Sequence, residues 1–483
     1  MEVTLPSRPL AEPVDGGGFD LLVAYANRLP VTRVRGEWRG SAGGLVTALR
    51  PALESRPSAW VGWDGGATEP LPRNLPGLDV ELAPVPLARG EVEDYYHGFS
   101  NSTLWPLLHG LVDHVKMERR WWRTYVDVNE RFARHGAALG PGVETAHWVH
   151  DYQLMLVPRA LRALDPARRI GFFLHVPFPA PELFARLPWR GQLLDGLLGA
   201  DVVAFQTEEY RDNFVRTCVR LRADAEADGT AVLLGDGRRV RTETHPISID
   251  VESFATRAAA PETQRVLSRL QRQFAGRRVL LGVDRLDYTK GILERLRAIE
   301  LLLDQRRELR GRVAFVQVAV PSRGDVREYR ELRRQAEELV GRINGRFTDP
   351  GEDVPVHYLY RGIPAERLLA YYRLADVCLV TPLRDGMNLV AKEFVVAQEA
   401  GGSAGALVLS EFAGASAQLP EALPCNPFDV VGLAGAIELA LELPTEERRT
   451  RIERMAARVR GHDVYRWAES ELDALRDVPV AAR

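Results

Sequence analysis

Short apolar runs typical of buried β-strands alternate with amphipathic helical stretches along most of this 483-residue chain. Leu21–Tyr25, Ile170–Leu174 and Val279–Val283 are three such runs, and polar or proline residues follow each of them closely. This alternation predicts parallel α/β sheets covered by helices. Because the chain is too long for one typical hydrophobic core, we expect two open α/β domains.

The division between the domains is predicted from a polar stretch at residues 239–261, which contains a proline turn at His245-Pro246. We therefore expect an N-terminal domain at 19–250 and a C-terminal domain at 251–460. Residues 1–18 are rich in proline and glycine, so we expect them to be disordered. Residues 461–483 are expected to form a C-terminal helix.

Composition excludes several classes of partner. The formal net charge of −3 gives no reason to expect nucleic acid. No stretch approaches the roughly 20 apolar residues that span a bilayer, so we expect no membrane association. The cysteines Cys218, Cys378 and Cys425 are far apart and form neither a metal motif nor a disulfide framework, which fits a cytoplasmic protein.

Charged or polar side chains stand directly after most of the predicted strands. In open parallel sheets, ligands bind outside the carboxyl ends of the strands, so these residues are candidates for a binding site. For a single arginine a surface salt bridge stays the alternative, and for a single histidine a structural role does. The residues at the strand exits are Arg28, Asp151, His175, Arg285, Arg323 and Asp385.

The segment Thr381–Glu393 follows the apolar run Ala375–Val380, turns at Asp385-Gly386 and continues into a helix predicted at 388–398. A helix N-terminus after a tight turn attracts phosphate. Asp385 and Glu393 add carboxylates that accept hydrogen bonds from hydroxyls. The segment therefore predicts a site for a sugar bearing a phosphate, with an ordinary strand-to-helix turn capped by an aspartate as the alternative.

Arg285 and Lys290 lie in one predicted strand-to-helix loop that ends at Gly291. A guanidinium binds phosphate oxygens bidentately and an ammonium supplies a mobile charge, so the pair is suited to a diphosphate. Two solvated surface cations are the alternative. The chain lacks a phosphate-binding glycine loop and an Asp-x-Asp pair, so we expect arginine, lysine and backbone donors, without a metal, to meet the phosphate charge.

Two further motifs carry weaker signals. The pair Gly43-Gly44 opens a predicted helix, as many ordinary turns do. Tyr96 and Trp105 are suited to an aromatic wall for a sugar ring, although a core position for Trp105 is an equal alternative.

Taken in order, these motifs resemble those of the trehalose-6-phosphate synthases, retaining glycosyltransferase family 20. The resemblance covers most of residues 20–430. The stretches that carry it are NRLP, SAGGL, YYHGFSNSTLWP, VHDYQL, IGFFLHVPFPAPELFARLP, GVDRLDYTKG, VPSRGDV, GRINGRF, TPLRDGMNLVAKEF and SEFAGA.

The resemblance implies a GT-B fold, with two Rossmann-like doubly wound domains, a cleft between them and a final helix that crosses back to the first domain. It implies transfer of glucose from a nucleotide sugar to glucose 6-phosphate with retention of configuration. The implied mechanism is a front-face displacement that needs neither a metal nor a cofactor.

The resemblance also implies residue roles. The acceptor glucose 6-phosphate would be held by Arg28, Tyr96, Trp105, Asp151 and Arg323. The donor would be held by Gly43, Gly44, His175, Arg285, Lys290, Ile363, Asp385, Asn388, Leu389, Val390 and Glu393. The catalytic residues would be His175, Arg285, Lys290 and Asp385.

Three questions stay open at this stage. Ile363 stands where some relatives have an aromatic residue facing the base, so both UDP-glucose and GDP-glucose remain candidate donors. Other phosphorylated acceptors, such as glycerol 3-phosphate or a cyclitol phosphate, a sugar-nucleotide epimerase and a non-catalytic regulator are the alternative functions. Self-association into a homo-oligomer is also left open.

Overall fold

The computed structural model describes residues 18–34, 37–40, 44–66, 80–140, 143–322, 326–351 and 353–478. It divides into two compact units. One runs to Ile247 and takes in the segment from Val464, and the other comprises Ser248–Asp463. The disorder predicted for residues 1–18 concerns a segment that, except for Gly18, lies outside the described residues.

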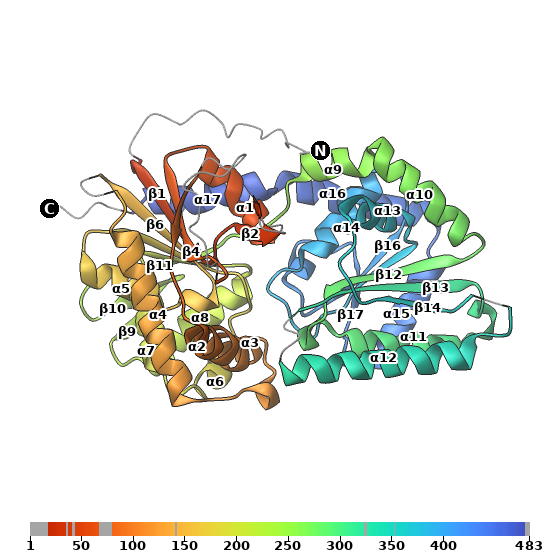
Figure 1. The fold of residues 1–483 in the computed structure, drawn as a ribbon, viewed down its shortest axis with the longest axis horizontal. Helices are drawn as coiled ribbons and strands as arrows, with labels where there is room; N and C mark the ends of the chain where they lie inside the picture. Colours follow the sequence, from red (N-terminus) through yellow and green to blue (C-terminus); the bar gives the residue numbers. More distant parts are fainter. Residues whose placement is uncertain are drawn as a thin grey trace. The chain divides into compact units, whose positions relative to one another are not determined.

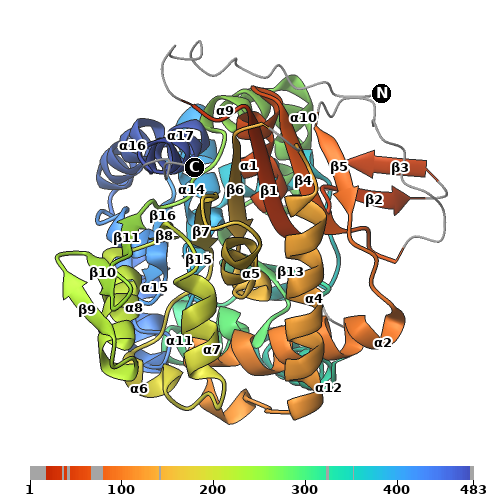
Figure 2. The same cartoon turned by 90° about the vertical axis from the view of Figure 1, so that its left-hand side faces the viewer.

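The first unit is built on a nine-stranded sheet. Seven neighbouring strands run parallel, and a hairpin of the last two adds an antiparallel edge that Figure 2 shows clearly. In spatial order the strands are β5 (Glu81–Pro84), β4 (Ser58–Trp63), β1 (Leu21–Arg28), β6 (Thr145–His150), β7 (Arg169–Leu174), β8 (Val202–Phe205), β11 (Arg239–Thr244), β10 (Ala231–Leu234) and β9 (Ala225–Asp228). Strands β4, β7 and β8 are buried at every residue, as expected for parallel strands covered on both faces.

The helical segments of this unit connect and cover the strands (Figure 1). They are α1 (Gly44–Glu54), α2 (Arg89–Glu91), the π-helical η1 (Val92–Leu104), α3 (Trp105–Leu108), η2 (Val112–His114), α4 (Arg119–Ala137), η3 (Tyr152–Leu154), α5 (Val157–Leu164), α6 (Pro181–Phe184), α7 (Arg190–Leu197), α8 (Glu208–Leu221) and α17 (Val464–Arg476). A separate two-stranded ribbon pairs β2 (Val31–Val34) with β3 (Glu37–Gly40).

The second unit contains a six-stranded, entirely parallel sheet. Its order is β14 (Val356–Leu359), β13 (Val313–Val320), β12 (Arg278–Arg285), β15 (Val377–Val380), β16 (Ala406–Ser410) and β17 (Leu423–Cys425). Strands β15 and β16 are buried throughout.

Helices lie on both faces of this second sheet. In Figure 1, α11 (Ile292–Gln305), α12 (Arg327–Phe347) and α15 (Val430–Glu442) lie on one side. On the other side lie α9 (Val251–Ala259), α10 (Pro261–Gln273), α13 (Ala365–Leu374), α14 (Leu389–Ala400) and α16 (Thr445–Gly461). Three short segments complete the unit, namely η4 (Tyr288–Lys290), η5 (Arg307–Leu309) and η6 (Gly414–Ala417).

Both units are doubly wound in the same way. In each sheet the first strand lies in the middle, two strands follow on one side, and the chain then crosses over to continue on the other. The reversal falls between β1 and β6 in the first unit and between β12 and β15 in the second. Such reversal points are where open α/β sheets bind ligands, so the predicted class of two Rossmann-like parallel-sheet domains is confirmed.

The last helix belongs to the first unit although it follows the second in sequence. Trp467 of α17 packs on Trp148 and Phe173, with ring centroids 5.4 and 5.3 Å apart. Gly171 leaves room for Leu475, because a Cβ at that glycine would come within 2.9 Å of its Cδ2. In Figure 1, α17 lies beside α1, with which it is in contact.

The polar stretch 239–261 was predicted to be the connection between the domains, but it contains a strand and a helix. Its first part forms β11, which pairs in parallel with β8, and its later part forms α9. The polar side chains of β11 misled the prediction, because they lie near an edge of the sheet where only Val240 and Thr242 are buried.

No helix within the described part of the chain is both long enough and apolar enough to cross a membrane.

Candidate functional site

An ion pair lies at the point where the second sheet reverses. The ammonium of Lys290, after β12, pairs with the Oδ2 carboxylate oxygen of Asp385, after β15. Their side chains are only 12% and 14% exposed. The sequence predicted both residues for the site, and the structure brings their charged groups into direct contact.

The loop that carries Lys290 is fixed from several directions. Asp287 accepts hydrogen bonds from the backbone N–H and the hydroxyl of Thr289, both at 3.0 Å, and from the hydroxyl of Tyr329 at 2.9 Å. The N–H of Leu383 donates to the carbonyl of Thr289 at 2.7 Å, which ties this loop to the loop after β15. Lys290 is therefore presented by a well-supported turn.

Gly291 explains how close the two loops come. Its φ of +63° is a left-handed conformation, and a Cβ there would lie 2.1 Å from the carbonyl oxygen of Thr381. Only glycine satisfies both conditions without displacing the backbone. The backbone at this glycine therefore approaches that of Thr381 closely.

The segment after β15 turns into α14 as predicted, but its cap is not an aspartate. Asn388 occupies the N-cap position with φ +73°, and its Nδ2 donates to Oδ2 of Asp385 at 3.0 Å. Asp385 itself bridges to Ala413, and its N–H donates to the carbonyl of Phe412 at 3.1 Å. The carboxylate of Asp385 is thus held beside the positive N-terminus of α14.

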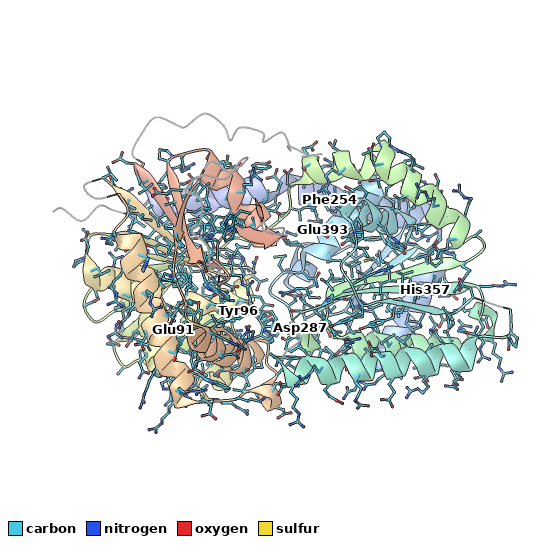
Figure 3. The ribbon with its side chains drawn as sticks, viewed as in Figure 1. Glu91, Tyr96, Phe254, Asp287, His357 and Glu393 are labelled. Carbon is cyan, nitrogen blue, oxygen red and sulfur yellow. The ribbon has the colours of Figure 1, made fainter. Side chains whose placement is uncertain are left out.

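Glu393 lies in the second turn of α14 and is partly buried (labelled in Figure 3). Burial raises the pKa of Glu393, and a hydrogen bond of 2.7 Å from the hydroxyl of Tyr372 opposes that rise. The neighbouring Lys392 is 1% exposed, and burial lowers its pKa to about 7. The second half of the predicted carboxylate pair therefore has a fixed position.

A second cluster forms where the first sheet reverses. The guanidinium of Arg28, the last residue of β1, lies 4.7 Å from the ring centroid of Trp63 and 5.5 Å from that of Tyr96. The two rings are 6.5 Å apart. A cation held against aromatic faces is pre-oriented with little loss of side-chain freedom on binding, so Arg28 is suited to an anion such as a phosphate.

Asp151 has the most unusual backbone of this cluster. Its φ of +75° is left-handed, which is rare for a residue other than glycine. Its N–H donates to the carbonyl of Phe173 at 2.8 Å, and its Oδ1 accepts from the N–H of His175 at 3.3 Å. Strained backbone of this kind is concentrated at functional sites. The two hydrogen bonds hold the Asp151 carboxylate at the exits of β6 and β7.

His175 and His150 form a pair at the same edge. Nε2 of His175 lies 3.2 Å from Nδ1 of His150. Burial lowers the pKa of His175 to about 3, and burial together with His175 lowers the pKa of His150 well below its usual value. Both imidazoles are therefore neutral at pH 7, and His175 acts as a hydrogen-bonding group, not as a cation.

The two predicted aromatic residues behave differently. Tyr96 is half-buried in the π-helical η1 (Figure 3), a form of helix often found at functional sites. Trp105 is 5% exposed and packs on His109 and Tyr152, with ring centroids 4.1 and 5.6 Å away. The structure thus gives Trp105 a largely buried position and leaves Tyr96 beside Arg28.

The remaining predicted residues are placed as follows. Arg285 is exposed at the end of β12, Ile363 is half-buried on the loop between β14 and α13, Leu389 and Val390 begin α14, and Gly44 begins α1. Arg323 and Gly43 lie outside the described residues.

Two residues that contact these clusters, one beside Arg28 and one donating to the carbonyl of Lys290, were missed by the sequence reasoning. Trp63 ends β4, a strand that was not predicted, so its position at a strand exit went unnoticed. Arg295 lies on the buried face of α11 with Ile292, Leu296 and Ile299. An arginine at helical spacing within an apolar face was a usable signal for it.

Within the described ranges, no three or more His, Cys, Asp or Glu side chains are grouped so that they could hold a metal ion.

The chain is similar to known proteins over nearly its whole length. The model of glycosyltransferase family 20 matches residues 21–477. A protein of Mycobacterium sp. (strain KMS) named trehalose-6-phosphate synthase is 44% identical over 489 residues, covering 98% of this chain and 98% of its own.

Solved structures agree over the same length. An E. coli structure bound with UDP-2-fluoro glucose has a TM-score of 0.87 and 36% identity, covering 95% of this chain and 99% of its own. An α,α-trehalose-phosphate synthase (UDP-forming) from Burkholderia xenovorans, in complex with glucose 6-phosphate, has a TM-score of 0.85 and 36% identity, covering 94% and 99%.

Proposed function

Because the chain belongs to glycosyltransferase family 20, we propose that it transfers glucose from a nucleotide sugar to glucose 6-phosphate and forms α,α-trehalose 6-phosphate with retention of configuration. The observation that carries this proposal is the contact between Lys290 and Asp385 at the reversal point of the second sheet. A fixed ammonium beside the N-terminus of α14 suits a diphosphate, and a carboxylate beside it suits the hydroxyls of a sugar.

The donor half of the reaction is assigned to the second unit. Lys290 and Arg285 neutralise the diphosphate, with the N-terminus of α14 as a further positive pole. Asp385 accepts hydrogen bonds from the glucose, and Glu393 accepts them from a ribose hydroxyl. Asn388, Leu389 and Val390 line the start of α14, and Ile363 lies near the base.

The acceptor half is assigned mainly to the first unit. Arg28, oriented by the rings of Trp63 and Tyr96, binds the phosphate of glucose 6-phosphate. Asp151 accepts a hydrogen bond from a sugar hydroxyl. Arg323, which is outside the first unit and outside the described residues, is proposed as a second phosphate ligand from the family resemblance alone. Trp105 supports the sugar from its buried position. His175, as a neutral imidazole, forms a hydrogen bond with the donor glucose.

The proposed mechanism is a front-face displacement. The bond from C1 of the donor glucose to the diphosphate oxygen breaks, and the anomeric hydroxyl of glucose 6-phosphate forms a new bond to C1 on the same face. The proton of that hydroxyl passes to the departing diphosphate oxygen. Arg285 and Lys290 stabilise the negative charge that develops there, so the proposed step requires neither a protein nucleophile nor a metal.

An assay of the purified protein tests the proposal. UDP-, GDP- and ADP-glucose are each supplied with glucose 6-phosphate, in chelator and with added magnesium, and the α,α-linkage is identified by NMR. We expect trehalose 6-phosphate from UDP- or GDP-glucose at equal rates with and without chelator. Transfer only to glycerol 3-phosphate or a cyclitol phosphate, or epimerisation of the donor without transfer, would replace the proposal. If the chelator abolished the activity and added magnesium restored it, the metal-independent mechanism would be wrong.

A further inference from the structure

Arg295 is a completely buried arginine at the reversal point of the second sheet. It is 0% exposed, and its guanidinium donates in four directions. One terminal nitrogen reaches Asp284 Oδ2 at 2.6 Å and Gln317 Oε1 at 2.8 Å. Nε reaches the hydroxyl of Thr381 at 3.0 Å, and the other terminal nitrogen reaches the carbonyl of Lys290 at 3.3 Å.

The surroundings of this guanidinium are shaped to hold it. A Cβ on Gly282 would lie 2.5 Å from both Arg295 and Gln317, so only glycine leaves the space that they occupy. Gln317 also donates from Nε2 to Asp284 Oδ2 at 3.2 Å, which closes the network. Satisfied buried networks of this kind specify one arrangement of the groups they join.

A gain in stability is a weak explanation for a buried charged group such as the Arg295 guanidinium. Removing two charges from water costs much of what their attraction returns, and well-packed apolar residues often replace a buried ion pair without loss of stability. What the network does supply is a connection. It joins Asp284 of β12, Gln317 of β13, Thr381 at the exit of β15 and the backbone of Lys290.

The two loops of the proposed donor site meet at this connection. Thr381 carries the hydroxyl that Arg295 binds, and its carbonyl lies against Gly291, directly after Lys290. The backbone bond from Leu383 to Thr289 joins the same loops again. A shift of Thr381 therefore moves the backbone of Lys290 and the start of the segment that leads to Asp385.

We propose that Arg295 is a positioning residue that sets the Lys290 ammonium and the Asp385 carboxylate in register for the diphosphate and sugar of the donor. This inference rests on the proposed function, because it assigns the donor to this site. Arg295 does not touch the reacting atoms. Its effect passes through the carbonyl of Lys290 and the hydroxyl of Thr381.

The sharpest test changes one hydroxyl. Thr381→Val keeps the shape of a fully buried side chain but removes the acceptor of Arg295 Nε, whereas Thr381→Ser keeps the acceptor. For Thr381→Val we expect kcat/KM for the nucleotide sugar to fall roughly tenfold or more, as loss of a buried hydrogen bond from a charged group does. KM for glucose 6-phosphate should stay within about twofold, and Thr381→Ser should recover most of the loss.

A second variant acts on the arginine itself. Arg295→Lys keeps the charge opposite Asp284, but one ammonium lacks the planar fork that reaches Thr381 and the Lys290 carbonyl together. We expect it to fold and to show the same selective loss for the donor. Variants of either residue with wild-type donor kinetics would overturn the inference, and so would a Thr381→Val protein that loses its fold, since that result would give Arg295 a purely structural role.

Calorimetric titration with UDP and GDP separates this inference from the proposed function. If the wild-type protein binds a nucleoside diphosphate but transfers to no acceptor, the proposed reaction fails while the positioning role is still measured, as a roughly tenfold or greater loss of affinity in Thr381→Val and its recovery in Thr381→Ser. Equal affinity in all three proteins would overturn the positioning role, whatever the reaction.

Discussion

Lys290 carries the positive charge on which the proposed donor chemistry depends most directly. Its ammonium is already paired with Asp385 and its side chain is only 12% exposed, so the charge is oriented and largely shielded from water. A donor placed beforehand at the point where negative charge develops is worth far more than a mobile surface charge. Arg285, by contrast, is exposed at the end of β12 and contributes a more adaptable guanidinium.

We predict that Lys290→Ala and Arg285→Ala each lower kcat for glucosyl transfer by roughly a hundredfold or more, as loss of a single pre-oriented charge does. Steady-state kinetics with both substrates measures the loss, and thermal unfolding checks that each variant is folded. Arg297→Ala is the matched control, because Arg297 is 48% exposed on the outer face of α11 and pairs only with Glu294 among the described residues. Turnover of Lys290→Ala near the wild-type level would remove its assigned role.

The position of a site residue could be predicted where the neighbouring sequence alone determines it. Lys290, Asp385 and Gly291 stand in short loops directly after apolar runs, so their grouping follows from the rule for strand ends. Trp63 joins the first cluster through Arg28, and Arg295 meets the loop after β15 through Thr381; each contact joins residues that are distant in sequence. The left-handed backbone of Asp151 likewise depends on its bond to Phe173, on a neighbouring strand.

Elements predicted best were those with a clear apolar core. The runs at Leu21–Tyr25, Ile170–Leu174 and Val279–Val283 lie within β1, β7 and β12. Strand β11 was missed because its polar, partly exposed residues resemble a linker. The π-helical η1 also lies beyond pattern reasoning, because its periodicity has no distinct sequence signature.

At the level of elements, the approach of the η4–α11 turn to the end of β15 can be tested at Gly291. We predict that Gly291→Ala destabilises the protein by more than the roughly 1–2 kcal/mol of a left-handed alanine, because its Cβ would also meet the carbonyl oxygen of Thr381 at 2.1 Å. Urea unfolding measures the change. Gly276→Ala is the matched control, since Gly276 has φ +78° but nothing within 4 Å of its Cβ position. If both variants lost the same free energy of unfolding, the contact of the new Cβ with the Thr381 carbonyl oxygen would add no cost.

The contact of α17 with the rest of the first unit contains a titratable ion pair. His245, directly after β11, lies 2.6 Å from Oε1 of Glu471, and Trp148 donates to Oε2 of the same carboxylate at 3.1 Å. Burial alone lowers the pKa of His245, but the hydrogen bond and the charge of Glu471 outweigh burial and raise it. The pair therefore stabilises the fold fully below the unfolded pKa of about 6.5 and loses this contribution as pH rises through the raised folded pKa.

We predict that Glu471→Gln lowers the free energy of unfolding by roughly 2 kcal/mol at pH 6 and by less at pH 8.5. Urea unfolding at both pH values measures the difference. Glu469→Gln, at an exposed position on the same helix, should change the free energy by no more than about 0.5 kcal/mol at either pH. A larger loss at pH 8.5 than at pH 6 would contradict the assigned direction of the pKa shift.

For the whole molecule, both units use the same strand order and place their candidate groups at the same topological position. In the first sheet, Arg28 ends one of the strands that flank the reversal and Asp151 follows the other. In the second sheet, Lys290 and Asp385 follow the two flanking strands. The alternation of strands and helices predicted this fold class directly, because each sheet is built from buried parallel strands. Family resemblance supplied the residue roles, which assign most acceptor ligands to the first unit and most donor ligands to the second. Periodicity does not contain this assignment.

That assignment can be tested on the intact protein by hydrogen–deuterium exchange. A ligand at a hundred times its Kd stabilises the native state by about 2.7 kcal/mol, enough to slow exchange in the loops that it contacts. We predict that UDP or GDP protects residues 284–291 and 381–393 most strongly, whereas glucose 6-phosphate protects 26–30, 92–105 and 150–154. Lys290→Ala should weaken the first pattern at equal nucleotide concentration and leave the second intact. Protection by the nucleotide confined to residues 21–154 would reverse the assignment of substrates to units.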